Sequence, residues 1–101
     1  MRIVWTEQAQ EDMDKIYAFW QLQNAQYAVK LYNSFIDKAE RLLSFPQIGH
    51  LENLLQHRNE NFRSLVIDEH NKLVYTIEGE DIVIHTVWDC RQNPKKLIKK
   101  V

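Results

Sequence analysis

Apolar residues recur every three or four positions in the first part of the chain, which is the spacing of one helical face. This first stripe comprises Ala9, Met13, Ile16, Tyr17 and Trp20. Thr6 precedes it as a candidate N-cap, and we expect the helix to end near Leu22. Ahead of the cap, residues 2–5 (RIVW) are rich in β-branched and aromatic side chains and predict a short first strand.

A second apolar stripe predicts a second helix after Asn24, which is a candidate cap. Its members are Ala25, Ala28, Tyr32, Phe35, Ile36, Ala39, Leu42 and Leu43. Pro46 bounds this helix, because proline disfavours the helical conformation in the residue before it. The joint between the two helices is short, so they must fold back as an antiparallel hairpin. Their stripes are too wide to cover only each other, and we expect the hairpin to pack on a sheet.

The pattern changes to strand-like runs after a predicted loop over residues 47–60. The runs lie at residues 62–67, 72–78 and 81–88. The last of them is almost continuously apolar and predicts a central strand. Residues 68–71 and 78–81 form short turns, and Gly79 can supply the positive φ that the second turn needs. Links this short make the three strands antiparallel.

The predicted element order is β-α-α-β-β-β, which is an α+β fold. We expect one domain over residues 1–101, with the antiparallel two-helix hairpin on one face of a small, mostly antiparallel sheet. The other face of the sheet is left without a predicted cover. On a domain this small, we interpret that face as the natural place for function or for a partner.

The composition is typical of a globular protein, with 45% hydrophobic and 27% charged residues. No apolar run reaches the roughly 18–20 residues of a membrane span. The first residues carry no apolar signal-peptide core, so we expect a cytoplasmic protein without membrane contact. The single cysteine excludes an internal disulfide framework and a cysteine-rich zinc site.

The net charge of −1 hides a strong polarity along the chain, because residues 1–90 carry −6 and residues 91–101 carry +5. The basic residues of the last segment are Arg91, Lys95, Lys96, Lys99 and Lys100. We treat residues 92–101 as a basic tail, in which a last helical turn could follow Pro94. The tail is either a solvated end or a patch for phosphates or an acidic partner.

Candidate chemistry is limited to a few side chains, since no phosphate loop, nucleophile elbow or metal-ligand spacing is present; we expect no metal and no cofactor. Arg63 and Lys72 could project together opposite the helices and bind phosphate, or serve as edge charges that prevent aggregation. His85 is either a buried, hydrogen-bonded residue or a general acid–base. Asp89 and Arg91 share a face of extended chain and could pair, while Arg91 could alternatively reach a phosphate.

Two further residues near the end of the last strand have two interpretations each. Trp88 is expected in the core, with base stacking as the alternative. Cys90 is expected to be a packed or incidental thiol, with a nucleophile as the alternative.

Five segments carry a resemblance to a known family. They are IVWTEQAQEDMDKIYAFW, FPQIGH, FRSLV, LVYTIEGEDIVIHTV and the closing WDCRQNP. In this order and in a chain of this length, they resemble the RelE/ParE-family toxins of type II toxin–antitoxin systems, from Ile3 to about Leu97. The resemblance implies a RelE/ParE-like fold, which agrees with the element order predicted from the residues.

The resemblance also implies a growth-inhibiting toxin, associated with plasmid stabilisation, that a cognate antitoxin holds inactive. RelE-like members cleave messenger RNA on the ribosome, and ParE-like members poison DNA gyrase. In the RelE-like branch the catalytic residues would be Arg63, Lys72 and Arg91 around phosphate, with His85 as the proton carrier. The last residues, RQNPKKLIKKV, contain neither the His nor the Tyr of cleaving relatives. We therefore expect the ParE-like role, inhibition by binding.

Two alternatives stay open: a metal-free, ribosome-dependent endoribonuclease, and a degenerate module that binds its antitoxin without harming the cell. In each case we expect an antitoxin with an acidic or amphipathic segment that meets the basic side chains of the last segment, namely Arg91, Lys95, Lys96, Lys99 and Lys100. Operator DNA is expected to be contacted only through the antitoxin.

Overall fold

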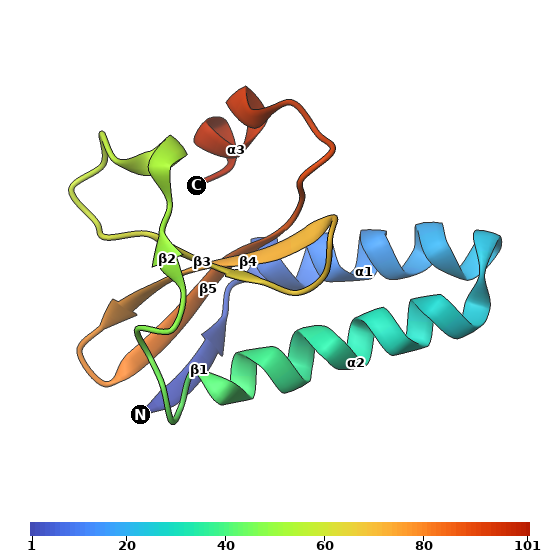
Figure 1. Cartoon of the computed structure of the whole chain (residues 1–101), viewed down its shortest axis with the longest axis horizontal. Coiled ribbons are helices and arrows are strands. Elements are labelled where there is room, and N and C mark those ends of the chain that lie inside the picture. The colour runs from blue at the N-terminus through green and yellow to red at the C-terminus, as the bar shows by residue number, and fades with distance from the viewer.

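A computed structural model describes all residues from 1 to 101 and has an α+β architecture (Figure 1). The elements in chain order are β1 (Arg2–Trp5), α1 (Glu7–Gln23), α2 (Ala25–Arg41), β2 (His50–Leu51), the 3-10 turn η1 (Asn53–Leu55), β3 (Arg63–Val66), β4 (Asn71–Glu78), β5 (Asp81–Asp89) and α3 (Pro94–Lys100). The predicted helices and strands are all present. None of the helices has the combination of length and apolar character that a membrane span needs.

The five strands form one sheet in the order β1-β5-β4-β3-β2. β1 runs parallel to β5, and the other neighbours are antiparallel, so the predicted mostly antiparallel sheet is confirmed. The short edge strand β2 lies within the segment that the sequence predicted as a loop. Two residues are too few to carry an alternating pattern, which is why the sequence did not indicate this strand.

Asn24 makes the helical hairpin possible, because this single residue separates α1 from α2. Its backbone N–H donates to the carbonyl of Trp20, and its side-chain Oδ1 accepts from the N–H of Tyr27. The first helix is fixed at its other end by Thr6, whose side chain accepts from Ala9 N–H and donates to the carbonyl of Ile84 on β5. The two caps therefore join the hairpin to the sheet with no loop residues to spare.

The main core lies between the helical hairpin and one face of the sheet. It includes buried residues from both helices and from β4 and β5, among them Met13, Leu31, Phe35, Leu73 and Ile84. The stripes predicted from the sequence supply most of the helical half of this core. Leu31 belongs to the core although the predicted stripe omitted it, and Leu43 of that stripe is exposed. Figure 1 shows α1 and α2 running side by side, as the short joint between them required.

The second face of the sheet is also covered over part of its area, and the expectation of an open face is wrong there. Leu55 of η1 and Leu97 of α3 pack with Val74 and Trp88 in a second core, together with Phe62. Figure 1 shows α3 beside the segment that contains η1. The sequence missed this cover because each covering segment is short and contributes a single fully buried side chain.

Candidate functional site

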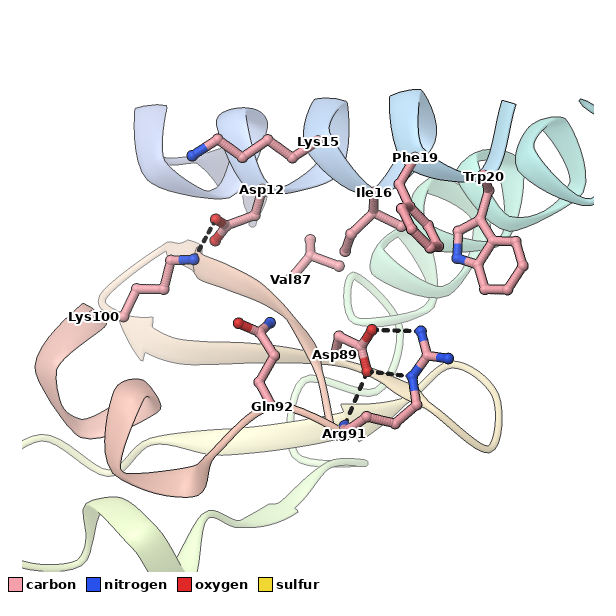
Figure 2. Close-up of a pocket in the computed structure, with 10 residues that line it drawn as sticks. All are labelled: Asp12, Lys15, Ile16, Phe19, Trp20, Val87, Asp89, Arg91, Gln92 and Lys100. Carbon is pink, nitrogen blue, oxygen red and sulfur yellow. Dashed lines mark hydrogen bonds and ion pairs between the residues drawn. The ribbon is translucent and has the colours of Figure 1, made fainter. Parts of the chain in front are cut away.

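A cleft of about 360 Å³ lies between α1, the end of β5 and the α3 segment (Figure 2). We call it the α1–α3 cleft and define it by the ten residues labelled in that figure. Ile16 and Val87 form its apolar middle, and an ion pair stands on either side of them. The volume falls within the roughly 300–1,000 Å³ that is usual for ligand sites.

Arg91 forms one end of the cleft and is held from two sides. Its Nε and Nη2 donate to the two carboxylate oxygens of Asp89 at 3.0 and 2.7 Å, so the first of the two alternatives for Arg91, pairing with Asp89, is present. Its Cζ also lies 5.8 Å from the centre of the Trp20 ring. The hydrogen bond from Arg91 is the main reason why the pKa of Asp89 is below its usual value. Arg91 is therefore a fixed charge rather than a mobile one.

Asp12 and Lys100 form the other end of the cleft, 2.7 Å apart between Oδ1 and Nζ. Asp12 is only 2% exposed and also accepts hydrogen bonds from Gln8 and Thr86. The sequence analysis did not single out this aspartate as a candidate site residue. One signal could have identified it, since position 12 falls between Ala9 and Ile16 on the apolar stripe.

The two cations predicted to project together, Arg63 and Lys72, lie on opposite faces of the sheet. Arg63 pairs with Tyr75, so these two side chains share a face of the sheet. Lys72 is three residues before Tyr75 on β4, and side chains an odd number of residues apart along a strand point to opposite faces. The prediction that Arg63 and Lys72 project on a common side is therefore wrong. Arg63 donates to the carbonyl of Gly49 at 2.8 Å. It does not contribute to a shared phosphate site with Lys72.

Lys72 is instead paired with Glu52, a buried carboxylate that no pattern in the sequence singles out. Glu52 also accepts hydrogen bonds from the Ser64 hydroxyl and the Leu54 N–H. Burial by itself would raise the pKa of Glu52, but these hydrogen bonds and the charge of Lys72 outweigh it and lower the pKa. The sequence placed Glu52 in a polar loop, where nothing distinguishes a buried acid from a solvated one.

His85 occupies a β-bulge, because Tyr75 pairs with Ile84 while the adjacent Val74 pairs with Thr86. Its Nε2 lies 2.8 Å from the Thr76 hydroxyl and 3.6 Å from Glu78 Oε2. Burial lowers the pKa of His85, and the nearby Glu78 carboxylate opposes that shift. His85 is thus half-buried and hydrogen-bonded, which is closer to the first of its two interpretations, a buried and hydrogen-bonded residue.

The four candidate catalytic residues are thus only partly brought together. Arg63 lines a cavity of about 370 Å³ with Thr76 and Glu78, the two side chains that contact His85. Lys72 is engaged with Glu52, and Arg91 lines the separate α1–α3 cleft. No group of three His, Cys, Asp or Glu side chains is placed to hold a metal ion.

Trp88 and Cys90 are adjacent in the sequence to residues of the cleft but do not line it, and they differ in their surroundings. Trp88 is buried in the second core, which confirms the expectation for it. Cys90 is an exposed residue, but partial burial of its thiol raises the pKa of that group. A raised pKa disfavours the thiolate, which is the nucleophilic form.

The basic tail forms α3 rather than an unstructured end. Pro94 stands in its first turn and Asn93 caps it. Lys95, Lys96 and Lys99 are exposed and have no carboxylate within ion-pairing distance, whereas Lys100 is tied to Asp12. The structure therefore leaves three of the five basic side chains of the last segment unpaired.

Comparison with known proteins identifies the family and a solved structure with a similar fold. The chain matches the ParE toxins of type II toxin–antitoxin systems, parDE, over residues 3–94. Among solved structures it is similar to a chain of the chromosomal ParDE TA system from P. aeruginosa, with a TM-score of 0.72 and 19% identity, over 88% of this chain and 95% of that one. No curated protein sequence gives a match. Because the family match extends from β1 to the start of α3, this chain belongs to the ParE toxin family of type II toxin–antitoxin systems.

Proposed function

We propose that this ParE-family chain inhibits growth in the cytoplasm by binding a cellular target, DNA gyrase, and that a cognate antitoxin neutralises it. One observation carries the preference for binding over catalysis. Lys72 and Arg91, two of the three cations that RNA cleavage would need at one phosphate, are each engaged by a carboxylate. A cation already paired with Glu52 or Asp89 neutralises little of the charge that develops on a phosphate.

A ribosome-dependent endoribonuclease is the second candidate, and one observation favours it. Thr76 and Glu78 connect His85 to the cavity that Arg63 lines, so a potential proton carrier and a cation lie around one space. In this function His85 would transfer the proton and Arg63 would contact the phosphate. Arg91 and Lys72 would have to give up their acidic partners to join them.

Expression of the chain without any antitoxin tests the proposed function. We expect growth arrest with a DNA-damage response, and inhibition of supercoiling when the purified chain is added to purified gyrase. Mapping messenger RNA 5′ ends after induction tests the endoribonuclease alternative. New cleavage sites that are absent in His85→Ala would support ribonuclease activity and contradict the proposed gyrase binding. Normal growth at confirmed soluble expression would identify a degenerate module.

The exposed lysines of α3 are proposed to pair with acidic side chains of the antitoxin. Operator DNA would be contacted by the antitoxin and not by this chain. Lys95, Lys96 and Lys99 have no acidic partner within the chain and are free to pair across an interface. Exposed charge pairs are screened over about 8–10 Å at physiological salt, so the complex with the antitoxin should weaken at higher ionic strength.

The contribution of the tail is best tested by substitution. Removing the residues after Pro94 would also remove Leu97, which is fully buried in the second core, and would therefore damage the fold. The triple variant Lys95→Gln, Lys96→Gln, Lys99→Gln removes the charges and keeps Leu97. A weaker complex with a reduced salt dependence supports the proposal, and an unchanged affinity removes the tail from it.

A further inference from the structure

The α1–α3 cleft has the composition of a protein-binding surface. Phe19 and Trp20 stand at its rim with Arg91, and aromatic and arginine side chains are the most frequent hot spots of protein interfaces. Phe19 is 53% exposed although it is one of the largest apolar side chains. One turn further along α1, Leu22 is 89% exposed and extends the apolar strip beyond the cleft. A small molecule in the cleft would leave that strip uncovered, whereas a polypeptide segment can cover both.

The charges around the cleft select an acidic occupant. Its two acids, Asp12 and Asp89, are already engaged by Lys100 and Arg91. Lys15 lies on the rim, is exposed and has no carboxylate within ion-pairing distance. Lys15 is thus the only charged residue of the cleft lining without an ion-pair partner, and the exposed, unpaired lysines of α3 belong to the element that supplies Lys100 to the cleft. Carboxylates on the occupant would complement these positive charges.

Nucleic acid fits the cleft less well. The apolar middle formed by Ile16 and Val87 offers nothing to a phosphate, whereas an amphipathic peptide can place an apolar side chain there. The donors of Arg91 that would grip a phosphate bidentately are the ones bonded to Asp89.

The ends of the cleft are also preorganised. Asp89 and Trp20 fix Arg91, and Asp12 fixes Lys100, so an occupant would not have to immobilise these long side chains (Figure 2). Side-chain ordering is one of the main costs of association. A cleft built in this way suits a flexible partner segment, which has its own ordering cost to meet.

We propose that the α1–α3 cleft is the docking site for an acidic, amphipathic segment of the antitoxin, which places an apolar side chain over Ile16 and Val87 and its carboxylates beside Lys15 and α3. The inference rests on the proposed antitoxin partner and adds the surface on the toxin and the chemistry of the segment. Phe19 and Trp20 would enclose the apolar side chain, and Leu22 would contact the next one along the segment.

The test uses the full chain and the protein encoded by the adjacent reading frame as the antitoxin probe. The cleft variant is Lys15→Glu with Phe19→Ser, and the matched control on α2 is Lys30→Glu with Val29→Ser. All four side chains are exposed, and Phe19 and Val29 are so to a similar extent (53% and 49%), so both variants should keep the fold, which circular dichroism can verify. We expect at least roughly tenfold weaker binding for the cleft variant, the equivalent of about 1.4 kcal/mol, and little change for the control.

Acetylation of surface lysines in the free and bound toxin gives a second readout. Lys15 should be protected in the complex, while Lys30 and Lys38 should react as in the free toxin. Equal binding by the cleft variant, or an unprotected Lys15 in a complex that does form, would overturn the inference and leave the proposed function intact. Absence of any complex with the wild-type toxin would overturn both. Protection of Lys15 in the free chain by self-association would make the occupant a second copy and would also overturn the inference.

Discussion

Lys100 Nζ lies 2.7 Å from Asp12 Oδ1, so a lysine of the basic tail ties the C-terminal helix α3 to the first helix. The same ammonium group lies 5.7 Å from the centre of the Trp88 ring in the second core. One side chain thereby joins α1, α3 and β5. The basic tail serves two purposes in consequence: Lys100 closes the fold, and Lys95, Lys96 and Lys99 remain available to a partner.

Lys100→Met should destabilise the protein, because it leaves the buried Asp12 carboxylate with only the neutral donors Gln8 and Thr86. Leaving a buried charged group without its partner costs about 1–3 kcal/mol or more. For a domain of this size, about 1 kcal/mol corresponds to a shift in Tm of about 4–8 °C. Lys99→Met is the matched control, since Lys99 is exposed and makes no ion pair. Thermal melts in which both variants lose the same Tm would contradict the role of the ion pair.

Gly49→Ala should be among the most damaging single substitutions in the turn after α2. A Cβ at this position would lie 2.7 Å from the Ser64 carbonyl oxygen and 2.8 Å from the buried Tyr75 ring. Neither can move easily, because Ser64 belongs to β3 and the Tyr75 hydroxyl accepts from Gly49 N–H and donates to the Pro46 carbonyl. We expect a loss of about 2 kcal/mol or more, in the range for overpacked cores.

Gly79→Ala provides the comparison for that steric effect. Gly79 has a φ of 63°, and a Cβ at this position would meet open space, so its substitution is opposed by backbone conformation alone. That cost is about 1–2 kcal/mol. Urea denaturation should therefore rank Gly49→Ala as the more destabilised variant, and Gly79→Asn as milder than Gly79→Ala, because asparagine tolerates positive φ. A reversed order of the two alanine variants would refute the crowding around Gly49.

The predictability of each feature follows from how much of the chain encodes it. The helical hairpin was predictable because two stripes repeat over many turns and Asn24 fits a cap at their joint. The second core was not, because η1 and α3 each contribute a single fully buried leucine and no periodic pattern.

The candidate site shows the same limit. Arg91 could be placed correctly, since its partner Asp89 is two residues away in the sequence. The side on which Arg63 and Lys72 lie depends on strand register, and a shift of one residue exchanges the faces. Asp12 and Glu52 are acids whose burial depends on lysines far away along the chain, and composition cannot reveal such pairs.

Glu52→Gln should destabilise the protein near neutral pH and much less in acid. The pKa of Glu52 is lower in the folded chain than its ordinary 4.5, so its ionised form stabilises the fold. That contribution is fully present above pH 4.5 and is lost as the pH falls through the lower, folded-state pKa. Urea titrations at neutral pH and in acid below that pKa should show the difference between variant and wild type shrinking in acid. A constant difference would mean that the charge of Glu52 contributes nothing.

His85 should titrate below its ordinary pKa of 6.5, because burial disfavours the protonated ring. Glu78→Gln should lower the midpoint further, since the Glu78 carboxylate favours the imidazolium. The pH dependence of the imidazole proton signals in an NMR titration gives both midpoints. By linkage, a depressed pKa stabilises the folded chain above pH 6.5, and this contribution disappears as the pH falls through the folded value. A wild-type midpoint above 6.5 would contradict the dominance of burial, and a rise in Glu78→Gln would contradict the role assigned to the Glu78 carboxylate.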